Sequence, residues 1–419
     1  SDNGDFTFSR GSNLSATRVG PGPNHYIEKG RENLLLQSNN FDTTPWNAQG
    51  VVTGGQADKD GGTSAWSFTP NGGTSGLTQN ITTGGVQTFS AYIKKNATNG
   101  VRIYMFGSAN VSPWFNLDTG SVISLSGAVD ATIVEYNSEW WRISVTCNST
   151  LSSIYFYCTN NAQVQVVGTI TIQDAQLEIG LAATEVVESG ATTGKAGILE
   201  DTPRFDYSGG ATCPSLLLEP SRANLIDYSE YLGNILVGNR MDINDLVDTS
   251  PEGLVNASKL TPDTTPNSTH QSNTFDYGSF VSGDKITISI FAKADGFSGI
   301  ILRFFNSSGA FTTNRIAKFD LSRGRWENTS MDGTTGVMEG AVGMEFLGNG
   351  WYRCYATATA DASGDVDIRM PVADVTAEDV YDEVFTGDGT KGVLIYGLQL
   401  EEGSYATSYI PNHSGGTIT

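Results

Sequence analysis

Apolar and polar residues alternate along several short stretches of the chain. The clearest is 286–290, where Ile286, Ile288 and Ile290 are separated by Thr287 and Ser289. An alternation with a period of two places the apolar side chains on one face of an extended strand. This stretch is therefore predicted to be a half-buried β-strand.

Other stretches rich in strand-forming residues follow one another along the chain, with turns rich in Gly, Asp and Asn between them. They include residues 89–93, 143–145, 154–157 and 166–172. Residues 373–385 are the most helix-like, and their pattern is irregular. The chain is accordingly predicted to be all-β.

Five blocks of sequence occur twice and in the same order. The first block has the pattern apolar-Glu-x-x-Arg-x-Asn-Leu and lies at 27–38 and again at 218–229. The other pairs are 89–94 with 288–293, 115–120 with 319–324, 140–142 with 351–353, and 176–184 with 399–407. Because the spacing between copies only grows along the chain, the second copy is the first with longer loops.

The duplication predicts two tandem antiparallel β-sandwich domains of the jelly-roll type. We expect an extended N-terminal arm, a first domain, a linker, a second domain and a C-terminal tail. Their predicted limits are 1–25, 26–190, 191–215, 216–411 and 412–419.

The chain is strongly acidic, with 45 Asp and Glu against 24 Lys and Arg among 419 residues, a net charge of −21. A basic face for duplex DNA or an anionic membrane is excluded, because phosphate neutralisation needs Lys and Arg. The predicted second domain carries −14 against −6 for the first. Much of its surplus lies in 361–402, which holds eleven acids and two bases and is interpreted as a solvated acidic face.

The first residues are polar, and no apolar run is long enough to span a membrane. We therefore expect a soluble protein made without a signal peptide and without membrane insertion. Its cysteines, Cys147, Cys158, Cys213 and Cys354, are interpreted as free thiols. The alternative is that Cys147 and Cys158 face each other across a hairpin.

The repeated blocks resemble jelly-roll domains of the carbohydrate-binding-module type, which bacteriophage fibre proteins often carry. The resemblance rests on the Asn-Leu opening, the Trp-x-Arg strand and the closing segment 399–411. The flanking segments 8–12, 197–207 and 216–225 resemble parts of phage tail fibres and head fibres more specifically. Head or tail is left open by these motifs.

The resemblance implies a structural virion protein, a fibre or decoration subunit that displays its jelly rolls for attachment to the host surface or to glycans. It further implies a homo-oligomer, in the form of a trimer, located in the virion with other virion proteins and host-surface polysaccharide as partners. The alternative is a free carbohydrate-binding protein or an accessory module of a polysaccharide-degrading system. Jelly rolls of this type often hold Ca²⁺, so a Ca²⁺ site stays open and the metal unknown.

The residues shared by both copies are predicted to serve the common scaffold. Half-buried Arg–carboxylate pairs would link the first and last strands, and the tryptophans would anchor the core. The alternative is that they bind a ligand. These residues are Arg31, Arg222, Trp140, Arg142, Trp351, Arg353, Glu178 and Glu401.

Tryptophans outside the shared blocks are the predicted glycan-binding residues, because an exposed indole stacks on the apolar face of a pyranose. They are Trp46, Trp66 and Trp114, each in polar, turn-rich surroundings. The alternative is that they cap loops or lie in subunit interfaces.

Catalytic motifs are absent from the sequence: it contains no nucleophile elbow, P-loop or dinucleotide-binding fingerprint in a fitting context. The pairs Asp365/Asp367 and Asp382/Glu383 would suit a glycan hydrolase only if a cleft and a raised pKa accompanied them. The chain is therefore predicted not to be an enzyme and to need no cofactor, with a hydrolase using the acids of 361–402 as a third hypothesis.

Overall fold

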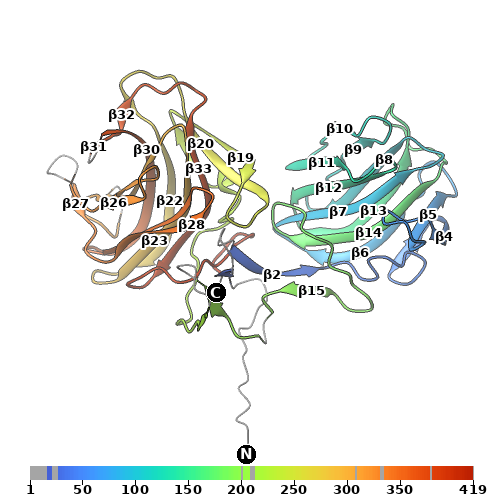
Figure 1. Ribbon diagram of the computed structural model, residues 1–419, viewed down its shortest axis with the longest axis horizontal. Helices are drawn as coiled ribbons and strands as arrows, with labels where there is room; N and C mark the ends of the chain where they lie inside the picture. Colours follow the sequence, from blue (N-terminus) through green and yellow to red (C-terminus); the bar gives the residue numbers. More distant parts are fainter. Residues whose placement is uncertain are drawn as a thin grey trace, which may run out of the picture. The chain divides into compact units, whose positions relative to one another are not determined.

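The computed structural model describes residues 17–20, 27–199, 202–207, 213–306, 309–330, 335–377 and 380–418. The chain divides into two compact units. One is Arg31–Leu199, and the other joins the residues up to Gly30 to Glu200–Thr419. We call these the first domain and the second domain. Each contains two facing layers of strands (Figure 1).

The first domain is built from two antiparallel six-stranded sheets. Sheet A has the order β10 (Ser121–Ser124), β9 (Trp114–Asn116), β8 (Gly100–Gly107), β13 (Leu151–Thr159), β6 (Leu77–Thr83), β3 (Trp46–Ala48). Sheet B has the order β11 (Asp130–Glu135), β12 (Trp140–Asn148), β7 (Val86–Lys95), β14 (Ile170–Ile179), β5 (Ala65–Pro70), β4 (Gly50–Gln56).

The core of the first domain lies between these sheets. Ile103 and Phe156 of sheet A share one buried cluster with Phe89, Ile143 and Leu177 of sheet B. Successive side chains of a strand point to opposite faces. Every second residue of β8 and β13 therefore points out of the sandwich, away from this core.

The second domain has two corresponding sheets. Sheet A′ has the order β26 (Arg325–Glu327), β25 (Arg315–Asp320), β24 (Gly299–Phe305), β30 (Gly364–Ala377), β22 (Gln271–Phe280), β18 (Val237–Asn239). Sheet B′ has the order β28 (Val342–Gly348), β29 (Trp351–Thr359), β23 (Lys285–Asp295), β33 (Gly392–Glu402), β20 (Val255–Pro262), β19 (Met241–Thr249).

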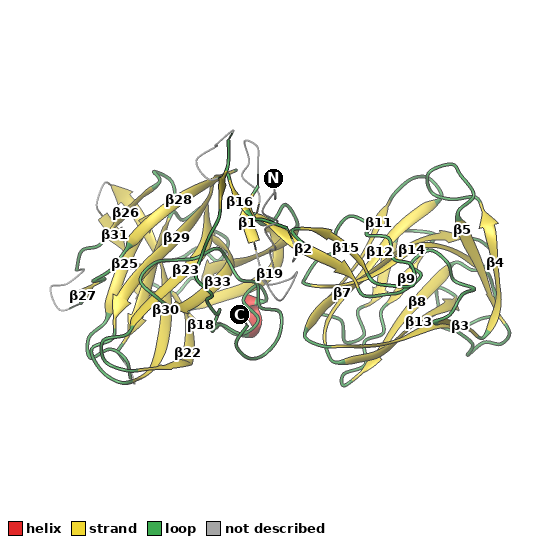
Figure 2. Cartoon of the chain, turned by 90° about the horizontal axis from the view of Figure 1, so that it is seen from below, coloured by secondary structure: helices red, strands yellow, loops and turns green. Residues whose placement is uncertain are grey.

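Short elements complete the second domain. β27 (Gly336–Val337) and β31 (Val380–Asp382) pair with strands of sheet A′, and β21 (Ser268–Thr269) pairs with β32 (Val384–Phe385). A 3-10 helix spans Leu232–Asn234, red in Figure 2. The helix-like reading of 373–385 is wrong: the described residues in this range include the end of β30, then β31 and β32.

The two domains match strand for strand, because sheets A and A′ and sheets B and B′ connect their strands in the same sequence order. The register also agrees. Trp140 pairs with Lys94 in the first domain, and Trp351 pairs with Lys293 in the second. The predicted all-β architecture of two tandem antiparallel sandwiches is confirmed.

The chain between the sandwiches is divided between the two domains. β15 (Gly194–Gly197) follows β14 in the first domain, so that domain ends at Leu199 and not at 190. β16 (Phe205–Asp206), β17 (Ser215–Leu216) and the tail residue Asn412, which is fully buried, belong to the second domain.

The first N-terminal strand and the beginning of the next one also belong to the second domain. β1 (Thr17–Val19) pairs with the start of β2 (Ile27–Asn33). The Thr17 hydroxyl donates to the Tyr409 carbonyl at 2.6 Å. The described part of the expected arm is thus a packed element of this domain, while the motif at 8–12 lies outside the described residues.

The cysteines Cys147, Cys158 and Cys354 are buried, Cys213 is exposed, and all four are free. Burial raises the pKa of Cys147 and of Cys158 to about 12. Within the described ranges, no helix has the length and apolar character that crossing a membrane requires.

Candidate functional site

The repeated Asn and Glu residues make the same hydrogen bonds in both domains, beginning with the first. Asn33 Oδ1 accepts from the Leu177 amide at 3.1 Å. Glu178 Oε1 accepts from Gln176 Nε2 and from the Thr184 amide, each at 2.8 Å. These bonds tie the start of the domain to its last strand.

The second domain repeats this set of contacts. Asn224 Oδ1 accepts from the Leu400 amide at 3.3 Å. Glu401 Oε1 accepts from Gln399 Nε2 at 2.8 Å and from the Thr407 amide at 2.9 Å. Because both carboxylates are buried and their acceptors are filled, the repeated segment holds the strands together and leaves no group for a ligand.

The repeated arginines bind the neighbouring strand. Arg142 Nη2 donates to Ser90 Oγ at 3.3 Å, and Arg353 Nη2 donates to Ser289 Oγ at 3.0 Å. Among the described residues, neither arginine forms an ion pair within 4.0 Å with a repeated glutamate. The prediction that these two arginines pair directly with the repeated glutamates is therefore wrong. Amide and hydroxyl groups donate to the carboxylates of Glu178 and Glu401 instead.

The remaining repeated residues also serve the scaffold. Trp140 and Trp351 are 1% and 2% exposed. Arg222 Nη1 donates to the Glu402 carbonyl at 2.5 Å. Burial raises the pKa of Glu178, and its hydrogen bonds together with the charge of Arg31 oppose that rise.

Two of the three predicted glycan-binding tryptophans face the protein. Trp46 is 6% exposed and packs in the core, its ring centroid 5.0 Å from that of Phe41 and 6.1 Å from that of Phe156. Trp66 is half-buried and its indole lies against Gly54, where an added Cβ would come within 2.9 Å of the ring. The prediction for Trp46 is wrong, and the Trp66 ring is covered by β4.

Trp114 lies instead on the outer side of sheet A among further aromatic residues. The alternation along β8, β9 and β13 sends one set of side chains to the core and the other outward. We call the outward set the aromatic face: Tyr104, Phe106, Trp114, Tyr155 and Tyr157. Four of its members are half-buried, and Phe106 is 45% exposed.

The aromatic face spans the neighbouring strands β9, β8 and β13 of sheet A (Figure 1). Tyr104 pairs with Tyr155 across the sheet, with 5.8 Å between ring centroids. Tyr155 and Tyr157 are nearly parallel, at 5° and 5.7 Å. Asn47 and Asn80 are exposed on the same side of the sheet. The result is a continuous group of aromatic rings with amide groups at its edge.

Arg102 lies at the centre of the aromatic face. Its guanidinium carbon is 4.9 Å from the ring centroid of Tyr104, 5.0 Å from that of Trp114 and 5.6 Å from that of Tyr157. Its Nε donates to Ser112 Oγ. Burial lowers the pKa of Arg102, while the neighbouring tyrosines act in the opposite direction. The guanidinium is held in place by cation–π contacts.

The corresponding surface of the second domain is different. Tyr104 and Tyr155 pair across the sheet in the first domain, and at this position Arg303 pairs with Arg369 in the second. Lys318 pairs with Ile301 there, as Trp114 pairs with Arg102 in the first domain. Charged residues therefore replace aromatic residues on sheet A′.

This second surface is also covered. Tyr381 of β31 packs in a buried cluster with Ile301 and Ile316. Glu383, just after β31, accepts from Arg303 Nη2 at 2.7 Å. Lys318 forms an ion pair with Glu327 at 3.0 Å. The first domain leaves its aromatic face open, whereas the second covers the equivalent face with its own chain.

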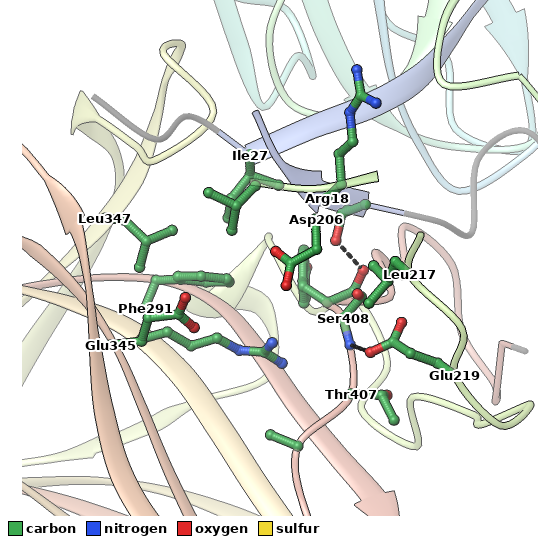
Figure 3. A pocket seen from close by; sticks show the side chains of 15 residues that line it. Arg18, Ile27, Asp206, Leu217, Glu219, Phe291, Glu345, Leu347, Thr407 and Ser408 are labelled. Carbon is green, nitrogen blue, oxygen red and sulfur yellow. Dashed lines mark hydrogen bonds between the residues drawn. The ribbon is translucent and has the colours of Figure 1, made fainter. Parts of the chain in front are cut away.

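A pocket of about 160 Å³ lies elsewhere in the second domain, beside β1 and β2 (Figure 3). The carboxylates of Asp206, Glu219 and Glu345 are near it. Glu219 is already bound by Arg204 at 3.0 Å and by the Ser408 amide at 2.7 Å. The pocket is smaller than the roughly 300–1,000 Å³ typical of ligand sites.

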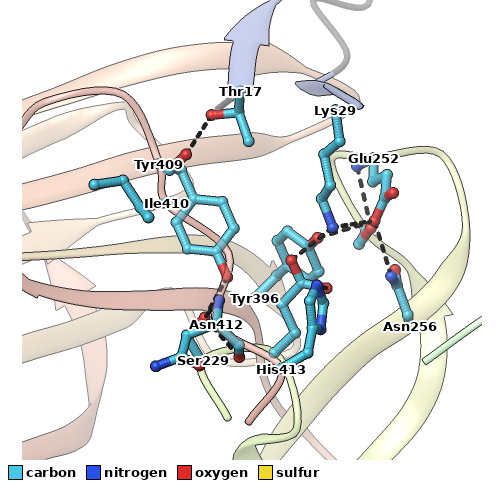
Figure 4. A network of polar contacts seen from close by, with 12 residues as sticks. Thr17, Lys29, Ser229, Glu252, Asn256, Tyr396, Tyr409, Ile410, Asn412 and His413 are labelled. Carbon is cyan, nitrogen blue, oxygen red and sulfur yellow. Dashed lines mark hydrogen bonds and ion pairs between the residues drawn. The ribbon is translucent and has the colours of Figure 1, made fainter. Parts of the chain in front are cut away.

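A buried polar network joins the beginning of β2 to the rest of the second domain (Figure 4). Lys29 Nζ lies 2.6 Å from Glu230 Oε1 and 2.8 Å from Glu252 Oε2. The Tyr396 hydroxyl donates to Glu252 at 2.9 Å. Burial disfavours the charged ammonium, but the two carboxylates outweigh it and raise the pKa of Lys29. The network fixes the N-terminal strand.

Acids of the stretch 361–402 have different surroundings. A hydrogen bond from Asp365 raises the pKa of Asp276, whereas other acids of the stretch have lowered pKa values. Burial acts to raise the pKa of Asp361, but hydrogen bonds from Thr312 and Arg315 lower it overall. Asp388 accepts from the Thr390 and Lys391 amides of its own turn, which keeps its pKa well below the usual range. Among the described residues, no group of three or more His, Cys, Asp or Glu could hold a metal ion.

Most residues of the aromatic face were not predicted from the sequence. The signal lies in 151–159, where the core positions Ile154 and Phe156 alternate with Tyr155 and Tyr157. A half-buried strand normally has polar residues at its outward positions. Aromatic residues at both kinds of position therefore mark an outer face that is not simply solvated.

Comparison with known proteins gives weak structural similarity only. No family model and no curated protein matches the chain. The tandem CBM22-1-CBM22-2 domains of Xyn10C from Paenibacillus barcinonensis have 11% identity and a TM-score of 0.26, covering 94% of this chain and 99% of theirs. Domains LG4-5 of the mouse laminin alpha1 chain have 8% identity and a TM-score of 0.18, covering 97% and 98%.

An oxalate decarboxylase from Lactobacillus farciminis has 6% identity and a TM-score of 0.14, covering 100% of this chain and 89% of its own. With TM-scores this low, none of these similarities bears on the function of the chain.

Proposed function

We propose that the first domain binds glycans on its aromatic face and that the chain is a non-catalytic attachment protein. The observation that carries this proposal is the open group of rings on the outer side of sheet A. Tyr104, Tyr155 and Tyr157 lie within 5.8 Å of their nearest aromatic neighbour on that face.

Aromatic side chains are suited to sugars because a pyranose has an apolar face that stacks on a ring, while its hydroxyls need polar partners at the edge. The aromatic face supplies both, with Asn47 and Asn80 as the exposed amides. Several coplanar or tilted rings in a row would accommodate more than one sugar unit. An extended polysaccharide is therefore the favoured ligand.

We further propose that this attachment protein is a bacteriophage fibre or decoration subunit, trimeric and located in the virion. This finer assignment rests on the resemblance of 197–207 and 399–411 to phage fibre segments. Detection of the chain in purified particles and a trimeric mass by light scattering would support it. A free monomer absent from particles would instead favour the alternative, a free carbohydrate-binding protein or accessory module.

A glycan array probed with the full-length chain tests the binding proposal. Tyr155→Ala should reduce binding strongly, because it removes the ring that contacts both neighbouring tyrosines. The matched control is Trp326→Ala, which removes a 44% exposed aromatic side chain from β26 of the second domain. Loss of binding in the control, or none in Tyr155→Ala, would contradict the assignment to this face.

A further inference from the structure

The six strands of sheet A contain a single charged residue, Arg102. Neither Asp nor Glu occurs in them, although the chain as a whole has a net charge of −21. The corresponding strands of sheet A′ include acidic residues such as Asp320, Glu327 and Asp367. The strands that form the aromatic face therefore carry no negative charge and one positive charge, that of Arg102.

Arg102 has no carboxylate partner in the part of the chain that the structure describes. Its Nε donates to the Ser112 hydroxyl, and among the described residues no carboxylate oxygen lies within 4.0 Å of its guanidinium. The second domain differs: there Arg303 is paired with Glu383 at 2.7 Å, and Lys318 with Glu327 at 3.0 Å. A half-buried guanidinium without a counter-ion retains its capacity for a charge-assisted pair.

We propose that the aromatic face takes an acidic glycan, and that Arg102 binds the carboxylate of a uronic or sialic acid unit while the flanking rings stack on the sugar chain. This inference rests on the proposed function, because it names the class of glycan that the aromatic face binds.

The chemistry of the site favours a carboxylate. A guanidinium presents donors in a planar fork that matches the two oxygens of a carboxylate. Tyr104, Trp114 and Tyr157 surround the guanidinium and hold it at a fixed position on the face. Rings also exclude water, so the pair would be screened less than an ordinary surface ion pair.

The second domain supplies an internal example of the same recognition. Arg303 lies at the position that corresponds to Tyr104, and the carboxylate of Glu383 is bound to it beneath the covering segment. An arginine on the outer face of this sheet therefore binds a carboxylate of a residue that lies outside the sheet. In the first domain no described segment of the chain fills that role for Arg102.

The test is binding of the full-length protein to an array that carries the same glycan backbones in neutral, carboxylated and sulfated forms. We expect the carboxylated forms to bind roughly ten- to a hundredfold more tightly than the neutral ones, the usual value of a charged hydrogen bond. Arg102→Gln should abolish that preference and leave the weak binding to neutral backbones. Arg102→Lys should retain part of it, because the charge stays and the fork is lost.

The control variant is Lys94→Gln, which removes the same charge from sheet B, where Lys94 is paired with Glu139 at 2.7 Å. It should leave the preference unchanged. Equal binding of neutral and carboxylated forms, a preference for sulfated forms, or an unaffected Arg102→Gln variant would overturn the inference. If Tyr155→Ala still lowers binding in those cases, the proposed function stands. If no glycan binds at all, both fail.

A subunit interface on this face is the competing outcome. Light scattering of Arg102→Gln and Tyr155→Ala distinguishes it, because an interface predicts that these variants dissociate an oligomer. Dissociation together with an empty array would overturn both proposals.

Discussion

The two domains share a topology and differ on one surface. Sheet A of the first domain presents Tyr104, Tyr155 and Tyr157 on its outer side. Sheet A′ of the second has Arg303 and Arg369 at the positions of Tyr104 and Tyr155, and Glu383 binds Arg303 there. By contrast, the hydrogen bonds of the repeated Asn and Glu residues are the same in both domains. The comparison separates the residues that keep the sandwich folded from those that are free to serve a ligand.

The residues that recur between the copies are therefore the wrong place to look for function in this chain. Glu178 and Glu401 have the same neutral donors at nearly the same distances. Of the five residues of the aromatic face, only Phe106 has an aromatic counterpart in the described strands of sheet A′, which is Phe305. The difference between the copies, more than their similarity, points to the binding surface.

The largest expected effect concerns the way the second domain is held together. Lys29→Met removes the ammonium and leaves Glu230 and Glu252 buried without a counter-ion. We expect a loss of about 3–5 kcal/mol in the free energy of unfolding of the second domain. The measurement is calorimetry of the full chain.

The first domain provides the control for this change. Its transition should keep its midpoint, because both carboxylates that bind the Lys29 ammonium belong to the second domain. If Lys29→Met shifted the unfolding transitions of both domains, or of neither, the claim that Lys29 stabilises the second domain alone would be contradicted.

A second substitution opens the covered surface. Tyr381→Ala removes the ring that packs on Ile301 and Ile316, and we expect a cost of about 3 kcal/mol to the second domain. The glycan affinity should equal that of the unsubstituted protein. Sheet A′, once uncovered, has Arg303 and Arg369 where sheet A has Tyr104 and Tyr155. New or stronger binding to neutral glycans would show that the cover alone distinguishes the two faces.

The aromatic face itself should respond to loss of a single ring. Tyr104→Ala removes one stacking surface and one cation–π partner of Arg102, and we expect about a tenfold loss of glycan affinity with little change in stability. Isothermal titration with the best array ligand measures it. Tyr136→Ala, an exposed tyrosine outside sheet A, serves as the control and should bind as the parent does.

The smallest expected effect is a pH dependence confined to the second domain. Burial, together with the charge of Lys29, lowers the pKa of His413 below its ordinary value of 6.5, and Glu230 and Glu252 only partly oppose this. The unfolded chain therefore takes up the proton more readily. The associated stability is complete above pH 6.5 and falls as the pH drops below it.

His413→Gln should make the melting temperature of the second domain less sensitive to pH between 7 and 5, by on the order of 2 °C. Melting curves of the parent and the variant across this range test it. A steeper dependence in the variant would show that folding raises, and does not lower, the pKa of His413.

The sequence was sufficient to predict the sandwich fold, because alternation along 286–290 and the doubled blocks depend on local periodicity and order. The site needed the structure for two reasons. Trp46 looks exposed in its turn-rich segment, but its ring enters the core beside Phe41. Tyr104 and Tyr155 are 51 positions apart and meet only through the pairing of β8 with β13.

The cover on the second domain also could not be foreseen. Residues around 381 have no clear period, and their contacts with Ile301 and Ile316 span long stretches of chain. Likewise, the residues beside Arg102 are set by the strands that adjoin β8. The order of the strands in the sheet cannot be read from the sequence.

A structure of the full chain bound to an oligosaccharide tests the central claim most directly. The account predicts that the sugar lies on sheet A of the first domain, stacked on Tyr104 and Tyr155, and that the covered face of the second domain stays unoccupied. A sugar bound on sheet A′, or in the loops at the end of either sandwich with the aromatic face empty, would contradict it.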